Sequence, residues 1–415
     1  MKKKLLLLET EMKGPGGHYL DNLIESFFFF KDDFQIYSLL NKSFDSRGTY
    51  VPDELEVLKL LNRNNFEKKN NKLLHYIFET LSFFKRFFLG IILVPFFLYK
   101  KNFVNYFNAL ISNRFILPRY FSEIYFFLKE NNFSSEDHIL FQTTRNKHMS
   151  LANFIIRLKL DIPKIHLRIL YTPSYNKLGG FNFFLNKIKP FLKKKKVFIY
   201  VLTKKNYEIL TNQLNFNEGI FMSNIPWVFF SRSINNLSKT IGYMGDARVN
   251  RGFNLLPELI EKLTAISSDF KFIIQYAKTD KTVIATSDKL HEMAKLNSNI
   301  NICQKYLDYK EFRDTLKKID IMPILHNSNE INLGNPSTIY SSITHEIPMT
   351  VPSNLKYMKD VLIHQSYEES NNIDETVKKI LLIKNNYTNY LESAKKNSSI
   401  LAAKFFNDPL KINIS

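Results

Sequence analysis

The most informative segment of the chain reads Gly334-Asn-Pro-Ser-Thr-Ile-Tyr-Ser-Ser-Ile-Thr-His-Glu-Ile-Pro348, followed by Met349-Thr-Val-Pro352. Its first three residues indicate a turn, Ser337 is a residue type that favours a helix N-cap, and the next residues predict a short helix. The unpaired N–H groups and the positive dipole end at the start of such a helix favour an anion, such as a diphosphate. Pro348 ends the helix, and the apolar residues after it predict a buried strand. A purely structural helix cap before a strand would show the same pattern.

A second segment has matching chemistry. It reads Lys239-Thr-Ile-Gly-Tyr-Met-Gly-Asp-Ala-Arg-Val-Asn-Arg-Gly252 and predicts a strand, a glycine turn carrying Arg248 and Arg251, and then an amphipathic helix. Arginine is planar and permanently charged, so it suits diphosphate oxygens. A glycine turn after a parallel strand lies at the sheet edge where α/β proteins bind phosphates. Either arginine alone fits a solvated surface charge, but together with the turn at Gly334 they predict an anion site.

With these two segments, the C-terminal half resembles the family-4-type retaining glycosyltransferases of the GT-B fold. Members of that family carry a G-Y-x-G opening followed by a basic residue and glycine, and later a G-x-P-S element that ends in G-x-P-V. Here Gly242-Tyr-Met-Gly245 and Arg251-Gly252 match the first, and Gly334-Asn-Pro-Ser337 with Pro348 matches the second. The resemblance implies an α/β fold of two Rossmann-like domains facing a cleft.

The resemblance also implies roles for individual residues. Arg248 and Arg251 would stabilise the leaving diphosphate. His18, at the start of the first helix, and Glu330, in the loop before the Gly334 turn, are candidates for contact with acceptor or donor. The residues expected to bind the nucleotide-sugar donor are Gly16, Gly17, Gly245, Tyr306, Asn335, Pro336, Ser337, Thr338, Ile339 and Ser341.

Three positions depart from the family pattern. Ser341 stands where the family has the glutamate that holds the donor ribose, Thr338 where it has lysine or glycine, and Glu346 where it has glycine. Serine and threonine still form hydrogen bonds, but weaker ones than a carboxylate or an ammonium group. The substitution at Ser341 therefore keeps open a catalytically silent binding subunit of a polysaccharide assembly complex. A nucleotide-sugar epimerase of the same fold is a further alternative.

The N-terminal half begins like a Rossmann-like domain. Lys4 to Thr10 predicts a buried strand, Lys13 to Gly17 a tight turn, and His18 to Phe30 a helix with apolar spacing. We expect an N-terminal acceptor-binding domain over residues 1–230, a donor-binding domain over 237–388, and a helix over 389–415 that crosses back to the first domain. A helical apolar insertion is expected over about residues 55–128.

Charge and apolar runs indicate a membrane surface. Of the formal net charge of +19, residues 1–237 carry +16 and residues 238–415 carry +3. The run Lys193-Lys-Lys-Lys196 adjoins a phenylalanine-rich helix, as in proteins that bind anionic lipid. The apolar segment Leu81–Tyr99 has basic flanks but a charge-free core too short to cross a bilayer. It fits an interfacial helix kinked at Pro95, or alternatively a buried core helix.

Composition limits the remaining possibilities. One cysteine, Cys303, excludes internal disulfides and cysteine-built metal sites and suits a reducing cytoplasm. The short run of leucines near the start does not predict a signal peptide. We find no nucleic-acid-binding module, no histidine metal pair, no nucleophile elbow and no P-loop in the sequence, so we expect no nucleic-acid partner. The resemblance implies sugar transfer from a nucleotide-diphosphate sugar to a lipid-linked or glycan acceptor, with no obligatory metal, and we expect no cofactor. The basic and apolar runs add the expectation that the protein works on the cytoplasmic face of a membrane.

Overall fold

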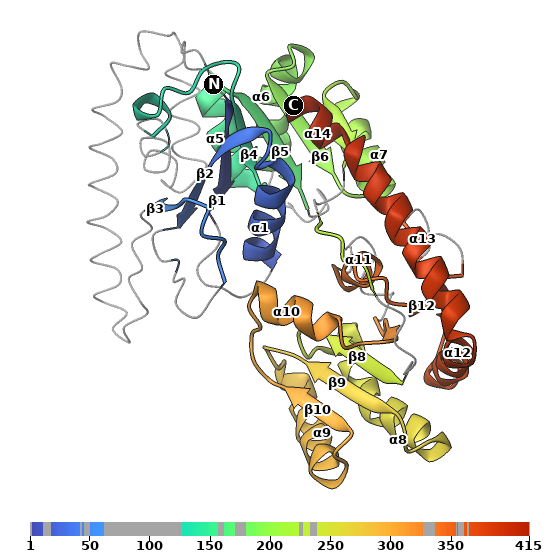
Figure 1. The fold of residues 1–415 in the computed structure, drawn as a ribbon. Helices are drawn as coiled ribbons and strands as arrows, with labels where there is room; N and C mark the ends of the chain where they lie inside the picture. Colours follow the sequence, from blue (N-terminus) through green and yellow to red (C-terminus); the bar gives the residue numbers. More distant parts are fainter. Residues whose placement is uncertain are drawn as a thin grey trace. The chain divides into compact units, whose positions relative to one another are not determined.

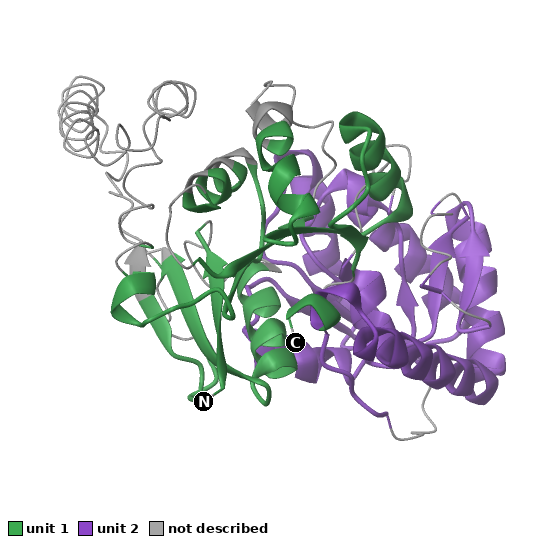
Figure 2. Cartoon of the chain, turned by 90° about the horizontal axis from the view of Figure 1, so that it is seen from above, with its two compact units in different colours: residues 1–47, 51–225, 412–415 green, residues 48–50, 226–411 purple. Residues whose placement is uncertain are grey.

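The computed structural model describes most of the chain in two compact units (Figure 2). Unit 1 comprises residues 1–47, 51–225 and 412–415, and unit 2 comprises residues 48–50 and 226–411. The described residues are 2–10, 18–41, 44, 50–61, 124, 127–156, 162–170, 180–223, 227–232, 239–326, 337–353, 355, 361–362 and 365–414. Most of the expected insertion over residues 55–128, including the apolar segment 81–99, lies outside them. Within the described residues, no helix is both long and apolar enough to span a bilayer.

The described strands of unit 1 form a seven-stranded parallel sheet with the order β3-β2-β1-β4-β5-β6-β7 (Figure 1). The chain therefore starts in the middle of the sheet, builds outward to β3, and returns to add β4 on the other side of β1. The predicted first strand and first helix are confirmed. The elements are β1 (Lys3–Glu9), α1 (His18–Phe30), β2 (Phe34–Asn41), β3 (Val57–Leu61), β4 (His138–Phe141), α5 (Asn146–Ile156), β5 (Lys164–Ile169), α6 (Gly180–Lys193), β6 (Val197–Val201), α7 (Lys204–Leu214) and β7 (Ile220–Met222).

The two faces of this sheet are buried by different chemistry. On one face, side chains at alternate positions of the strands pack against α5, α6 and α7 in a purely apolar cluster. The leucines of β1 alternate between the two faces, and both sets are buried, which explains why this strand is a continuous apolar run. The other face contacts α1 and contains polar side chains among the apolar ones.

A buried chain of three polar rings crosses that second face. His138 Nδ1 lies 2.9 Å from His166 Nε2, and His166 Nδ1 lies 2.9 Å from the Tyr200 hydroxyl. All three side chains are buried, and His166 stacks on Phe198. Burial lowers the pKa of His138 to about 4 and lowers that of His166 well below its ordinary value. Both imidazoles are therefore neutral in the folded protein at neutral pH.

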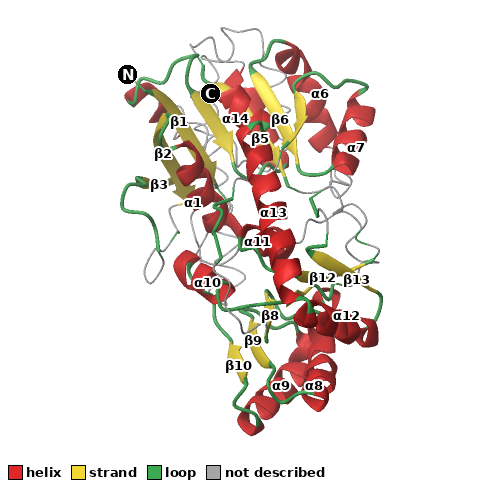
Figure 3. Ribbon diagram, turned by 45° about the vertical axis from the view of Figure 1, so that its right-hand side comes forward, coloured by secondary structure: helices red, strands yellow, loops and turns green. Residues whose placement is uncertain are grey.

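The described strands of unit 2 form two three-stranded parallel sheets, β10-β9-β8 and β11-β12-β13, which are joined by a bridge between Ile241 and Ile321 (Figure 3). The combined order is β10-β9-β8-β11-β12-β13, the doubly wound order of a dinucleotide-binding domain. The strands are β8 (Thr240–Met244), β9 (Lys271–Gln275), β10 (Ile300–Cys303), β11 (Met322–Pro323), β12 (Met349–Pro352) and β13 (Tyr367–Ser370).

The helices of unit 2 include those predicted after Gly252 and after Ser337, whereas the single helix predicted over residues 389–415 is divided into α13 and α14. The short helix predicted after Ser337 is present as α11 (Ser337–Thr344), and α10 (Tyr309–Leu316) begins with a capping box formed by Asp308 and Glu311. The remaining helices are α8 (Leu256–Ile266), α9 (Ile284–Leu296), α12 (Ile373–Asn385), α13 (Tyr387–Phe406) and α14 (Pro409–Ile414), with short 3₁₀ turns η2 (Val249–Arg251), η3 (Phe253–Leu255) and η4 (Lys281–Val283).

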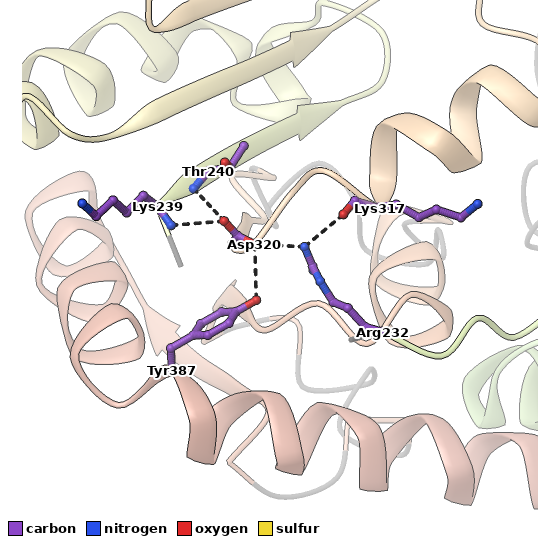
Figure 4. A network of polar contacts seen from close by, with 6 residues as sticks. All are labelled: Arg232, Lys239, Thr240, Lys317, Asp320 and Tyr387. Atoms are coloured by element: carbon purple, nitrogen blue, oxygen red, sulfur yellow. Dashed lines mark hydrogen bonds and ion pairs between the residues drawn. The ribbon is translucent and has the colours of Figure 1, made fainter. Parts of the chain in front are cut away.

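Asp320 joins several elements of unit 2 at the start of β11 (Figure 4). Its carboxylate accepts hydrogen bonds from the backbone N–H groups of Lys239 and Thr240, at 3.1 and 3.0 Å. It also pairs with Arg232 at 3.0 Å, and both side chains are almost buried. The Tyr387 hydroxyl donates to the same carboxylate from α13. Asp320 therefore fixes β8, β11, α13 and the connecting segment 227–232 to one another.

Glu346 explains one departure from the family pattern. Its φ is +56°, in the left-handed region that favours glycine, the residue that the family has at this position. Its carboxylate Oε2 accepts a hydrogen bond of 2.7 Å from the backbone N–H of Arg232. The hydrogen bond of the Glu346 side chain to the connecting segment thus offsets the cost of the left-handed backbone at this position.

The buried histidines predict acid sensitivity of unit 1. Unfolded histidine binds a proton below about pH 6.5 whereas the folded side chains stay neutral, so stability is full above that pH and is lost as the pH falls below it. We expect unit 1 to lose about 2–3 kcal/mol between about pH 7.5 and pH 5.5. Pulsed hydrogen exchange of peptides covering β4 to β6 across a urea series measures this loss. Equal urea midpoints at the two pH values would contradict the neutral assignment.

Replacing Asp320 should destabilise unit 2. Asp320→Asn leaves the nearly buried Arg232 without its counter-charge, which typically costs about 3–5 kcal/mol. Trp227, the one tryptophan of the chain, lies in the connecting segment, so its fluorescence during urea unfolding reports the change. The matched control is Asp269→Asn, which removes an exposed pair with Lys239 and should cost less than about 1 kcal/mol. Equal effects of the two substitutions would argue against a central role for Asp320.

Candidate functional site

The turn that carries the two predicted arginines lies at the carboxyl end of β8, beside the end of β11. These two strands are neighbours, and the chain order reverses between them, because β9 and β10 lie on one side and β12 and β13 on the other. In doubly wound sheets, ligands bind at such a switch point. Gly245 follows β8 directly, and the turn η2 with Arg251 comes next. Leu325 and His326 follow β11.

Two glycines shape the turn after β8. Gly245 has a φ of +142°, and a Cβ atom built there would lie 2.8 Å from Nη1 of Arg251. Gly252 has a φ of +72°, and its Cβ would lie 2.1 Å from the carbonyl oxygen of Leu325. Both backbone conformations favour glycine. Gly245 therefore leaves space for the Arg251 guanidinium, and Gly252 lets η2 approach the chain that follows β11.

The two predicted arginines have different electrostatic surroundings. Arg248 Nη2 forms an ion pair of 2.7 Å with Asp246, and its side chain is exposed. The Arg251 guanidinium is partly buried and makes no ion pair or hydrogen bond with any residue that the structure describes. A half-buried, uncompensated cation is costly unless an anion neutralises it. Arg251 is therefore the better candidate for binding a ligand anion.

His326 lies beside Arg251 and was not identified from the sequence. Burial and, secondarily, the charge of Arg251 lower its pKa to about 4, so the imidazole is neutral at neutral pH. Its Nδ1 is buried without a partner among the described residues, as is Oδ1 of Asn250 in η2. The signal in the sequence was that His326 follows the apolar run 321–325, at the end of a buried strand segment where ligand-binding residues of an α/β sheet lie.

Tyr306 lies at the same edge of the sheet, after β10. Its side chain is 42% exposed, and Nζ of Lys278 lies 5.7 Å from the ring centroid. A hydrogen bond with Tyr306 raises the pKa of Lys278. A backbone bridge between Ala247 and Thr279 holds the loop of Arg248 beside the loop of Lys278. Two loops thus place cations and one exposed aromatic ring along the edge, an arrangement suited to phosphates and a nucleobase.

In helix α11, the backbone N–H groups are better candidates for ligand contacts than the side chains, because most of these side chains are buried. Ile339 is completely buried, so only its N–H group could face a ligand. Thr338 and Ser341 are also buried. The Ser341 carbonyl accepts from the imidazole of His345 at 2.8 Å, while the Ser341 hydroxyl has no hydrogen bond to any residue in the described part of the chain. This hydroxyl stands where the family has a carboxylate.

Several predicted site residues lie outside the described residues. These are Gly16, Gly17, Glu330, Asn335 and Pro336. His18 begins α1, but its side chain is not described. The convergence of Arg251 with Ser337 at the start of α11 stays a prediction.

Unit 1 contains a polar cluster at its own switch point, between β1 and β4. The backbone N–H of Arg145 donates to Nδ1 of His148 at 2.9 Å, so the neutral ring carries its proton on Nε2 and donates it to Thr10, 2.5 Å away. Arg145 also donates to the hydroxyl of Tyr19, and Ser26 of α1 donates to Gln142. The sequence signal for this cluster was the polar run after β4, Gln142-Thr-Thr-Arg145, which the sequence analysis did not use.

Substitution of Gly252 should mainly reduce stability, whereas substitution of Gly245 should mainly weaken anion binding. Gly252→Ala places a methyl group against a backbone carbonyl, so we expect a loss of at least about 2 kcal/mol of stability. Gly245→Ala displaces the flexible end of Arg251, so we expect weaker binding of inorganic pyrophosphate at a smaller stability cost of about 1 kcal/mol. Urea unfolding followed by Trp227 fluorescence and calorimetry with pyrophosphate measure the two effects. Identical profiles for the two variants would contradict this division.

Comparison with known proteins supports one architecture. No protein-family model matches the chain, and no curated protein matches it. Among solved structures, it is similar to Anabaena Alr3699/HepE in complex with UDP and glucose, with a TM-score of 0.57 and 12% identity over 99% of this chain and 97% of that one. It is similar to a glycosyltransferase from Rickettsia africae, with a TM-score of 0.54 and 12% identity over 98% and 94%.

A third similar structure is S. aureus TarM in complex with fondaparinux, α-GlcNAc-glycerol and UDP, with a TM-score of 0.50 and 14% identity. That match covers 69% of this chain, which spans only 56% of TarM. Identities this low show the fold alone. The parallel sheets, their strand order and these similarities together show that the chain is an α/β protein of the GT-B fold.

Proposed function

We propose that the protein is a glycosyltransferase that moves a sugar from a nucleotide-diphosphate sugar to a lipid-linked or glycan acceptor. The observation that carries this proposal is the uncompensated, half-buried guanidinium of Arg251 at the switch point of unit 2. The solved proteins HepE and TarM, which share the fold, were each crystallised with UDP. A nucleoside diphosphate is therefore the ligand that best fits this cation.

The proposed mechanism rests on electrostatic stabilisation of the leaving group. As the bond between the sugar and the diphosphate breaks, negative charge accumulates on the oxygen of the β-phosphate. Arg251 would neutralise that charge, and the N–H groups of Ser337, Thr338 and Ile339 at the start of α11 would donate hydrogen bonds to it. Removing one such preorganised donor typically costs about 3–4 kcal/mol of barrier. As the resemblance implies, the reaction would retain the anomeric configuration and need no metal.

The remaining donor contacts follow from the same edge of the sheet. The exposed ring of Tyr306 would stack on the base, and the hydroxyl of Ser341, which is buried but has no hydrogen bond among the described residues, would bind the ribose. Arg248 would have a smaller role because Asp246 already neutralises it. Gly16, Gly17, His18 and Glu330 keep their proposed roles as contacts for donor or acceptor.

We further propose that the protein works on the cytoplasmic face of an anionic membrane. The lysines of the run 193–196, which joins α6 to β6 in unit 1, are all exposed, so they can approach lipid phosphates. The excess positive charge of the first half of the chain acts in the same direction. A lipid-linked acceptor would then be available at the surface to which the protein binds.

Arg251→Ala should lower sugar turnover at least about tenfold while leaving the protein folded. Purified protein is screened with UDP-, GDP- and dTDP-sugars, with and without membranes, and release of the nucleotide is measured. Arg248→Ala is the matched control, since it removes an exposed arginine of the same turn and should lower turnover less than Arg251→Ala.

The same screen separates the alternatives. A catalytically silent subunit would show no turnover with any donor, and an epimerase would change the sugar without releasing it. Unchanged turnover in folded Arg251→Ala would contradict the assigned mechanism.

A further inference from the structure

His326 occupies an unusual position next to the proposed diphosphate site. It directly follows Leu325, whose carbonyl oxygen contacts Gly252 at the end of η2. The imidazole is therefore held beside the turn that carries Arg251. Nδ1 is buried and has no partner among the described residues. A buried polar atom left unpaired costs free energy, so such an atom indicates that a partner is present in the working state.

Burial, and secondarily the charge of Arg251, keeps the imidazole of His326 neutral by lowering its pKa. Arg251 is the nearby charge that acts on the imidazole, and it disfavours a second positive charge there. Tyr243, at the end of β8, lies near the same turn. The charges of Arg251 and Arg248 lower the pKa of its hydroxyl, and that of Asp246 raises it. Burial raises the pKa of Tyr243, so this phenol stays neutral. Hence no described anion offsets the charge of Arg251 at His326.

We propose that His326 binds the pyrophosphate group of the donor together with Arg251 and takes up a proton from solvent when that group enters. This inference rests on the proposed function and adds a second cation to its site. Without ligand, imidazolium and guanidinium would repel each other, so the ring stays neutral and Arg251 is the single cation of the pair. An anion in contact with both removes the repulsion and compensates the desolvation of both charges. The site therefore becomes doubly positive only when it is occupied.

This coupling has a consequence for catalysis. A free nucleoside diphosphate carries one more ionisable oxygen than the intact donor sugar, and the charge on that oxygen appears as the glycosidic bond breaks. The proton that His326 took up on donor binding would therefore stabilise the leaving group more than the bound donor. Stabilisation that is stronger in the transition state than in the ground state is what raises turnover.

The test measures proton uptake and affinity in the whole protein. Calorimetry with UDP and with inorganic pyrophosphate is run in buffers of different ionisation enthalpy, at about pH 6.5 and about pH 8. We expect the wild-type protein to take up protons on binding at the lower pH, and its affinity to increase as the pH falls. His326→Ala should bind both probes about tenfold or more weakly, as expected for loss of a hydrogen bond to a charged group.

Two variants separate binding from structure. In His326→Asn, the amide nitrogen replaces Nδ1 as a donor but cannot take up a proton. We expect affinity within about threefold of wild type at about pH 8 and loss of the proton uptake at the lower pH. His291→Asn is the matched control, because His291 lies on α9, where it bonds to Tyr276 and Gln304. It should leave both readouts unchanged.

The outcomes distinguish this inference from the proposed function. If His326→Ala and His326→Asn match wild type in affinity and proton uptake while Arg251→Ala loses binding, the role of His326 is wrong and the transferase assignment stands. If the folded wild-type protein binds neither UDP nor pyrophosphate, both are wrong. If His326→Ala does not fold, His326→Asn provides the test. Loss of proton uptake in this variant supports the inference, and proton uptake equal to that of wild type contradicts it.

Discussion

The contact between Gly252 and the carbonyl oxygen of Leu325 is the constraint on which the candidate site depends. No larger residue fits there without moving the backbone, because a Cβ atom would lie 2.1 Å from that oxygen. The close approach brings the turn after β8 against the chain that follows β11. Arg251 and His326, which are 75 positions apart in the sequence, thereby become neighbours at the switch point. The chemistry of the site thus follows from one glycine that permits two backbone segments to touch.

Charge compensation distinguishes three other arginines from Arg251, the proposed anion-binding residue. Arg232 is paired with Asp320, and Arg248 with Asp246. Arg313 is buried between the rings of Trp227, Phe230 and Tyr309, where cation–π contacts help to hold it. Arg251 has no such partner in the described part of the chain. Because partly buried charges are costly unless something neutralises them, the arginine without a counter-charge in the described part of the chain is the one that we propose binds a ligand anion.

Unit 1 uses buried polarity differently. The rings of His138, His166 and Tyr200 form hydrogen bonds with one another across three strands, in a face that buries polar and apolar side chains together. The cluster of Thr10 and His148 instead lies at the carboxyl ends of the strands, where α/β sheets bind ligands. The first set fits a role in fixing the packing of the sheet. The second lies where a ligand of unit 1 would be expected from the topology of the sheet.

The sequence by itself determined the alternation of strands and helices, the glycine turn with its arginines, and the helix that begins at Ser337, because these depend on local periodicity, capping and turn preferences. It could not determine which arginine is neutralised, since Asp246 precedes both Arg248 and Arg251 in the same turn and Asp320 is 88 positions from Arg232. Nor could it select His326, His148 or Asp320, whose neighbours come from distant segments. Only the tertiary structure brings these groups together, because parallel strands that are remote in sequence end at one edge of a sheet.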